Sequence, residues 1–122
     1  MPDPRHDLGL RAEAAVAAWL EGDGWTVLAR RWRVPEGELD LVCLDRAGAL
    51  VGVEVRARRT RRSGSPLESV DRRRIGRLRR ALARYAAAMS GRHDGTRLDL
   101  VSVTPAAEGR WLLRRYPALD AW

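Results

Sequence analysis

The segment GELDLVCLDRAGALVGVEVR, at residues 37–56, constrains this chain more than any other, because it predicts two strands that carry charged residues on one face. Glu38 and Asp40 are two residues apart in the first run, and Glu54 and Arg56 are two apart in the second. Side chains at positions i and i+2 lie on the same face of a strand, so each pair shares a face. The other face is expected to be apolar and to consist of Leu39, Leu41, Cys43, Val51, Val53 and Val55.

The turn between these two runs predicts how the strands pair. A three-residue hairpin loop at 46–48, which ends on a glycine, places Asp40 opposite Glu54. The same register places Glu38 opposite Arg56. Directly opposed side chains have Cβ atoms about 5 Å apart, and two carboxylates at that distance are unfavourable without a cation between them. The register therefore predicts a divalent metal site beside a guanidinium, and an exposed ladder of cross-strand ion pairs is the alternative.

The remaining chain alternates between helical and strand patterns. Helices are expected at 8–23 and 70–90, with Asp7 and Ser69 as their N-caps. Further strands are expected at 25–34, 97–104 and 110–116, and the second run of the hairpin extends over 49–58. The order of helix, three strands, helix and two strands predicts one α/β domain over residues 1–122, with a mixed sheet.

Each expected helix has an apolar stripe beside charged residues. In the first helix the stripe is assigned to Leu10, Ala14, Ala17 and Ala18, and Glu13 lies beside it as a surface glutamate or a partly buried acid. In the second helix the stripe is Ile75, Leu78, Leu82, Tyr85 and Met89. Arginines occupy the rest of that helix, namely Arg72, Arg73, Arg77, Arg80 and Arg84. This face, and the basic loop at 59–66, either contact phosphates or are merely solvated.

The composition favours a polyanionic partner. The chain of 122 residues carries a net charge of +7, and all 23 of its basic residues are arginine. A basic chain of this kind most plausibly binds nucleic acid, and a protein that is only basic is the alternative. One cysteine excludes an internal disulfide, and no run of 18 apolar residues or secretory signal is present. We therefore expect a cytoplasmic protein that does not enter a membrane.

Five segments together resemble the YraN-like family, small bacterial proteins that are predicted to be nucleases. They are LGLRAEAAVAAWLEGDGW at 8–25, GELDLV at 37–42, VGVEVRAR at 51–58, GSPLESVDRRRIGRL at 64–78 and RLDLVSV at 97–103. That family is similar to restriction endonucleases and archaeal Holliday-junction resolvases of the PD-(D/E)xK superfamily. The resemblance implies a restriction-endonuclease-like three-layer core, with a mixed sheet of about five strands flanked by helices.

The resemblance also implies roles for individual residues. Asp40 matches the family's metal-binding aspartate, Glu54 matches the acid of the (D/E)xK motif, and Glu13 matches a helix glutamate that contributes to the metal site in related resolvases. Arg56 and Arg74 stand where the family often has lysine. Arginine stays protonated, so Arg56 can stabilise charge on a phosphate but cannot act as a base.

The function expected from these observations is Mg²⁺- or Mn²⁺-dependent hydrolysis of phosphodiester bonds in DNA, including branched DNA. The expected catalytic residues are Asp40, Glu54 and Arg56, and the expected metal ligands are Glu13, Asp40, Glu54 and the carbonyl of Val55. The expected nucleic-acid contacts are Arg58, Arg59, Arg61, Arg62, Arg73, Arg74 and Arg77. The alternatives are a non-catalytic nucleic-acid-binding module with a degenerate site and a subunit that binds an acidic protein. A homodimer would suit a substrate with two strands.

Overall fold

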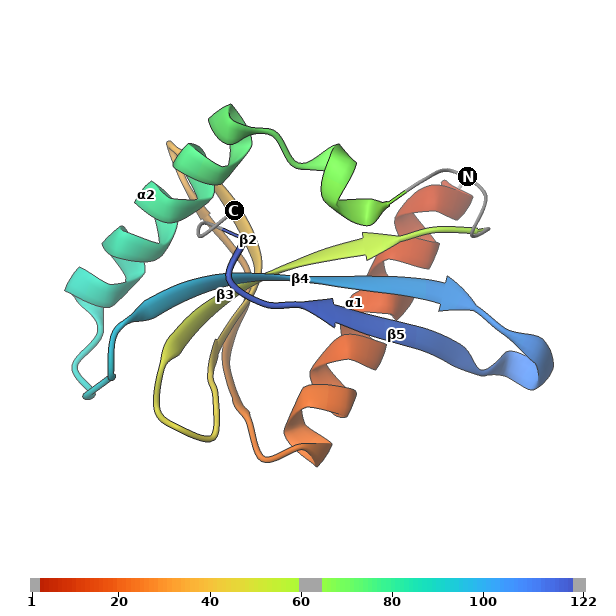
Figure 1. Cartoon of the computed structure of the whole chain (residues 1–122), viewed down its shortest axis with the longest axis horizontal. Helices are drawn as coiled ribbons and strands as arrows, with labels where there is room; N and C mark the ends of the chain where they lie inside the picture. The colour runs from red at the N-terminus through yellow and green to blue at the C-terminus, as the bar shows by residue number, and fades with distance from the viewer. Residues whose placement is uncertain (1–2, 60–64, 120–122) are drawn as a thin grey trace.

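The computed structural model describes residues 3–59 and 65–119, which form a five-stranded mixed sheet between two helices (Figure 1). The elements in chain order are α1 (Pro4–Gly22), β1 (Thr26–Val34), β2 (Gly37–Leu44), β3 (Leu50–Ala57), α2 (Arg72–Ala88), β4 (Thr96–Pro105) and β5 (Trp111–Tyr116), with short 3₁₀ segments at Pro66–Ser69 and Ala107–Gly109. The predicted α/β class and order of elements are confirmed. No helix among the described residues is long and apolar enough to span a membrane.

The strands lie side by side in chain order, β1-β2-β3-β4-β5. Only the β3–β4 pair is parallel, and α2 lies in the connection between these two strands. The helices cover opposite faces of the sheet, which gives three layers and two separate cores (Figure 1). The α1-side core includes Val16, Leu20, Leu41, Val53 and Val101, and the α2-side core includes Val42, Leu78, Leu82, Leu98 and Leu100. The sheet is therefore buried on both faces at its centre.

Helix α1 begins earlier than predicted. Its N-cap is Asp3 rather than Asp7, because the Asp3 side chain accepts a hydrogen bond from the N–H of Arg5 and Pro4 suits the first helical position. The predicted stripe is also wrong in part, since Ala14 and Ala18 are exposed. The buried residues of α1 are Leu8, Ala12, Val16, Ala17 and Leu20. Glu13 adjoins this stripe and is half-buried.

Helix α2 is capped by Asp71, whose side chain accepts a hydrogen bond from the N–H of Arg74, and not by Ser69 as predicted. Ser69 instead ends the 3₁₀ segment that precedes the helix. The predicted stripe is confirmed, because Leu78 and Leu82 are buried and Ile75, Tyr85 and Met89 pack against the same core. Arg72, Arg73, Arg77, Arg80 and Arg84 are exposed, as expected.

The predicted hairpin register is confirmed for the four residue pairs between Leu41–Val53 and Leu44–Leu50. The loop has three residues because the N–H of Asp45 donates to the carbonyl of Ala49, and Gly48 adopts a φ of +93°. Glycine has no Cβ to oppose this left-handed conformation. The hairpin therefore places Asp40 next to Glu54, one position beyond the last pair of the ladder.

One expectation about this hairpin is wrong: Leu39 does not share a face with Leu41. The β1–β2 ladder pairs Arg30 with Leu41 and Trp32 with Leu39, but it skips Arg31 and Asp40 between them. Arg31 has a φ of +47°, which is uncommon for a residue with a Cβ. Because both strands carry one unpaired residue here, Leu39 packs in the α2-side core and Leu41 in the α1-side core.

Candidate active site

Asp40 lies where the sheet separates locally. It is absent from the residue pairs of both adjacent ladders, and its Oδ2 accepts a hydrogen bond of 2.8 Å from the N–H of Val55 on β3. The side chain therefore occupies a position that a backbone carbonyl would otherwise fill. Burial, together with the neighbouring carboxylate of Glu54, raises the pKa of Asp40 to about 8. An acid that holds its proton near neutral pH marks a position where a cation would be stabilising.

Glu54 is buried on β3 with an exposed fraction of 4%. Its Oε1 lies 3.0 Å from Nη2 of Arg74 and 3.7 Å from Nη1 of Arg56. Its Oε2 is buried and has no hydrogen-bond partner. Buried carboxylate oxygens are normally paired, so this atom would be satisfied either by a proton on Asp40, whose side chain hydrogen-bonds to Glu54, or by a cation.

These contacts do not fit an exposed ladder of ion pairs. Glu54 is buried, whereas an exposed ladder would leave it accessible to water. Glu38 pairs with Arg33 on β1, at 3.3 Å, and not with Arg56 as the register suggested. Arg56 turns instead toward the connection that leads to α2, where its Nε donates to Oγ of Ser69 at 3.2 Å.

Glu13 approaches the acid pair from α1. Glu13, Asp40 and Val55 line one cavity of about 320 Å³. Burial raises the pKa of Glu13, and Arg31 at 3.7 Å partly opposes that rise. Asp40 also lines a second cavity of about 280 Å³, together with Arg74 and Arg77. Asp40 thus borders a cavity on each side of the sheet, and both cavities are lined by acidic and basic side chains together.

The residues fit a divalent cation in part. In the metal-free protein, no group of three or more His, Cys, Asp or Glu side chains within residues 3–59 and 65–119 is arranged to hold a metal ion. Asp40 and Glu54 are adjacent, and Glu54 has an unpaired oxygen. Carboxylate oxygens of this kind are the protein ligands that Mg²⁺ and Mn²⁺ prefer, and Mg²⁺ is often held by only one or two of them.

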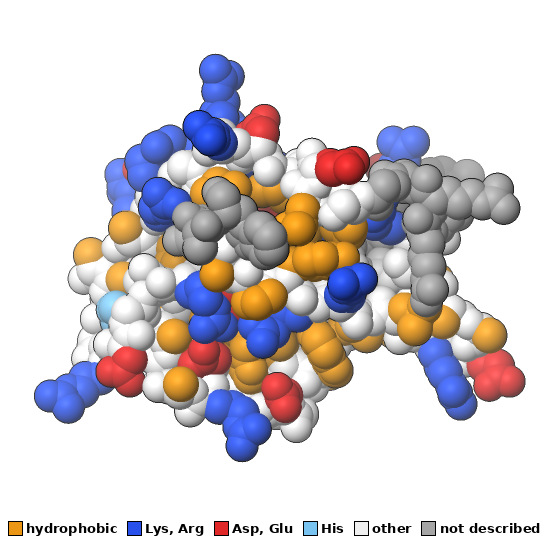
Figure 2. All heavy atoms as spheres, viewed as in Figure 1, with side chains coloured by type: hydrophobic (Ala, Val, Ile, Leu, Met, Phe, Trp, Pro, Cys, Tyr) orange, Lys and Arg blue, Asp and Glu red, His pale blue; other side chains and the backbone are white. Residues whose placement is uncertain are grey.

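The arginines expected to contact nucleic acid have different positions. Arg73 and Arg77 are exposed on α2, where basic side chains gather on the surface (Figure 2). Arg59 is exposed just after β3, whereas Arg61 and Arg62 lie outside the described residues. Arg74 differs from the others, because its guanidinium contacts Glu54 inside the site.

A second charged cluster, which was not predicted from the sequence, is centred on Asp99 of β4. Asp99 is completely buried, and its two carboxylate oxygens accept hydrogen bonds of 2.8 and 3.0 Å from Arg97 and one of 2.9 Å from Arg115. Both guanidinium groups lie over the ring of Trp25. Alternation along residues 97–103 puts Asp99 on the same strand face as Val101 and Val103. An acid on an apolar face was therefore the sequence signal for this cluster. The cluster is fully paired and stabilises the fold beneath α1.

Comparison with known proteins places the chain among bacterial proteins of similar length. The model of the uncharacterised protein family UPF0102 matches residues 12–103. A UPF0102 protein of Beutenbergia cavernae is 40% identical over 102 residues, which cover 84% of this chain and 86% of that protein. One of Deinococcus radiodurans is 41% identical over 101 residues, which cover 82% of each. One of Anaeromyxobacter dehalogenans is 38% identical over 116 residues, covering 95% of this chain and 85% of that protein.

Proposed function

The chain belongs to the uncharacterised protein family UPF0102, and from the geometry of its acidic site we propose that it is a metal-dependent nuclease that hydrolyses DNA. The observation that carries this proposal is the buried Asp40–Glu54 pair, in which Oε2 of Glu54 has no partner. Such a pair is unfavourable in the free protein and becomes favourable when a divalent cation lies against it. The resemblance to the PD-(D/E)xK nucleases supports the same chemistry.

In this proposal Mg²⁺ or Mn²⁺ is held by Asp40, Glu54 and the carbonyl of Val55, and Glu13, which lines the same cavity as Asp40, is the further acid that faces the ion. The bound ion would lower the pKa of a water molecule and neutralise the phosphate. Asp40 releases its proton when the ion binds, because only the carboxylate is a ligand. Val55 holds Asp40 through its N–H, and Arg74 holds Glu54 through its guanidinium.

Arg56 is proposed to stabilise the charge that develops on the phosphate during attack by water. Its side chain is 28% exposed, and it lies 3.7 Å from Glu54 and against Ser69, which places its guanidinium at the border between the acid pair and solvent. Arginine remains protonated, so Arg56 would not accept the proton that the attacking water loses.

The contacts of Glu54 favour a second candidate, a nucleic-acid-binding module without turnover. Its Oε1 is already paired with Arg74 and lies near Arg56, so these two cations partly replace the charge that a metal ion would supply. In that case the arginines of α2 bind phosphates, and the acid pair only maintains the architecture.

A cleavage assay separates the two functions. Labelled single-stranded, duplex, flap and four-way-junction DNA is incubated with Mg²⁺ or Mn²⁺ and with the parent, Asp40→Asn or Arg56→Lys protein. The nuclease predicts cleavage by the parent, loss in Asp40→Asn, and no loss in Glu108→Gln, which removes an exposed acid (79% side-chain exposure) far from the site. Cleavage that appears only in Arg56→Lys, or in no protein, supports the binding module.

Metal binding is measured independently of cleavage by calorimetric titration with Mn²⁺. The proposal expects binding to the parent and to Arg56→Lys, and a large loss in Asp40→Asn. Equal Mn²⁺ affinity in the parent and Asp40→Asn would contradict the metal site itself.

A further inference from the structure

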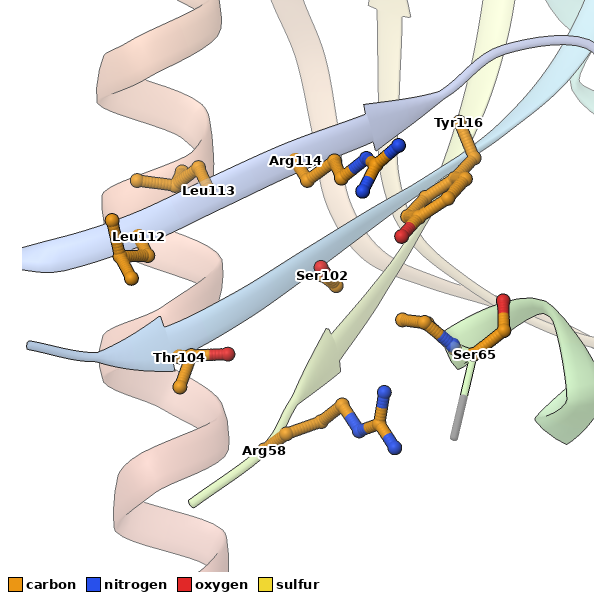
Figure 3. A pocket seen from close by; sticks show the side chains of 9 residues that line it. Arg58, Ser65, Ser102, Thr104, Leu112, Leu113, Arg114 and Tyr116 are labelled. Atoms are coloured by element: carbon orange, nitrogen blue, oxygen red, sulfur yellow. The ribbon is translucent and has the colours of Figure 1, made fainter. Parts of the chain in front are cut away.

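A larger cavity lies on the α2-side face of the sheet, over β3, β4 and β5 (Figure 3). Its volume is about 600 Å³, and it is lined by Arg58 from the end of β3, Ser102 and Thr104 from β4, and Arg114 and Tyr116 from β5. Figure 3 shows Tyr116 and Arg114 on one side, Arg58 on the other, and Ser102 between them. None of the described residues that line this cavity is acidic.

The floor of this cavity is in register with the acid pair. On the α2-side face, Leu100 pairs with Glu54 on one side and with Tyr116 on the other. In the next row of the sheet, Ser102 pairs with Arg56 and with Arg114. Neighbouring strands are about 4.8 Å apart, so Tyr116 lies about 10 Å from Glu54 along the sheet. That spacing is short enough for neighbouring nucleotides of one strand to reach both positions.

Tyr116 has the surroundings of a stacking platform. The ring is half-buried against the α2-side core, and the guanidinium carbon of Arg114 lies 5.2 Å from its centroid, so a stacked base would take the place of this guanidinium over the ring. Leu112 lies on the same face of β5 and is 43% exposed. In the space-filling view, hydrophobic and basic side chains occur together over the middle of the molecule, where β4 and β5 lie (Figure 2). An aromatic ring, an apolar neighbour and two arginines suit a ligand with a planar apolar part and an anionic part.

We propose that this cavity binds an unpaired segment of nucleic acid, with one base stacked on Tyr116 and adjoining phosphates on Arg58 and Arg114. This inference rests on the proposed function and specifies its substrate class, which is nucleic acid with an unpaired segment next to the cleaved phosphodiester bond. Duplex DNA presents phosphates but no free base face, so it cannot use Tyr116. An acidic protein segment could pair with the arginines, but it would not require an aromatic ring beside them.

Binding is tested by fluorescence anisotropy with the full chain in EDTA, so that the result does not depend on catalysis. The probes are labelled single-stranded DNA, single-stranded RNA of the same sequence and blunt duplex DNA. Tyr116→Leu removes the ring but keeps apolar volume, and it should weaken single-strand binding roughly tenfold. Tyr116→Phe should bind like the parent. Arg114→Gln should lower the slope of log affinity against log salt concentration by about one, as expected for the loss of one phosphate contact. Arg110→Gln, which changes a residue just before β5, should leave the affinity for single strands unchanged.

A photo-cross-link tests the same contact in the unmodified protein, where folding of a variant is not in question. Single-stranded DNA that carries 5-iodouracil should cross-link to Tyr116, as mapped by mass spectrometry. Each of three results would overturn the proposal. The first is cross-links confined to α2, and the second is equal affinity of Tyr116→Leu and the parent for single strands. The third is a parent that self-associates and becomes monomeric in Tyr116→Leu. If the parent binds single strands through Tyr116 but cleaves nothing, the cavity assignment stands and the nuclease proposal fails.

Discussion

Asp40→Asn should stabilise the metal-free protein increasingly as the pH rises. The pKa of Asp40 is raised to about 8 in the folded protein, against a value of 3.8 for the free side chain. Between these values the folded state holds a proton that the unfolded chain has lost, so the free energy of unfolding falls by about 1.4 kcal/mol per pH unit. From pH 4 to pH 7 the parent should lose at most about 4 kcal/mol through this group.

The asparagine avoids this loss because it does not titrate. Its Oδ1 can still accept the N–H of Val55, and its amide can keep the side-chain hydrogen bond that the protonated Asp40 makes with Glu54. The substitution therefore removes the titrating group and keeps these hydrogen bonds without changing the volume of the side chain.

The measurement is urea denaturation of the parent and Asp40→Asn in EDTA at several pH values between about 4 and 9. The difference in unfolding free energy should grow with pH and level off near pH 8. Glu108→Gln is the control, since it removes an acid that is exposed on the surface. If the parent and Asp40→Asn lose or gain stability in parallel over this range, Asp40 does not retain its proton and the account of the site is wrong.

Three further predictions follow from the same structure. Affinity for Mn²⁺, measured by calorimetry, should rise about tenfold per pH unit up to about pH 8, because Asp40 must lose one proton to bind the ion; affinity that is flat with pH contradicts this. Asp99→Asn should cost about 3 kcal/mol of unfolding free energy, because it removes the buried carboxylate that pairs with Arg97 and Arg115 and leaves Arg97 with Asp45 alone; a cost below about 1 kcal/mol would mean that the cluster is not structural. Burial raises the pKa of the Cys43 thiol to about 12, so Ellman's reagent should react only as the protein unfolds, and rapid reaction under native conditions would show that the thiol is accessible.

The local features of the hairpin were predictable from the sequence. The three-residue loop follows from a glycine at position 48, and the register that places Asp40 beside Glu54 follows from the loop. The order of elements and the stripe of α2 also follow from simple periodicity, because leucine, isoleucine and tyrosine recur there at helical spacing. These features depend on residues that are close together in the chain.

The remaining features depend on contacts that periodicity does not encode. Alanines dominate α1, so several stripes are equally apolar and only packing selects the one that contains Ala12 and Val16. The unpaired positions Arg31 and Asp40 leave no compositional signal, yet together they change which face Leu39 occupies. The contact of Arg74 with Glu54 joins residues 20 positions apart on different elements, and no rule of sequence spacing predicts it.

The position of the acid pair within a single hairpin has a consequence for the kinetics of folding. Asp40 and Glu54 meet when a short loop closes, which is among the fastest events available to a chain. Arg74 reaches them only when α2 docks and the non-local parallel β3–β4 pairing forms, which is slower. During this interval the two carboxylates repel each other without the cation that accompanies Glu54 in the native state. At pH values above the ordinary pKa of aspartate, repulsion between the carboxylates of Asp40 and Glu54 therefore slows the closing of the hairpin. The same repulsion makes the folded site favourable for a metal ion.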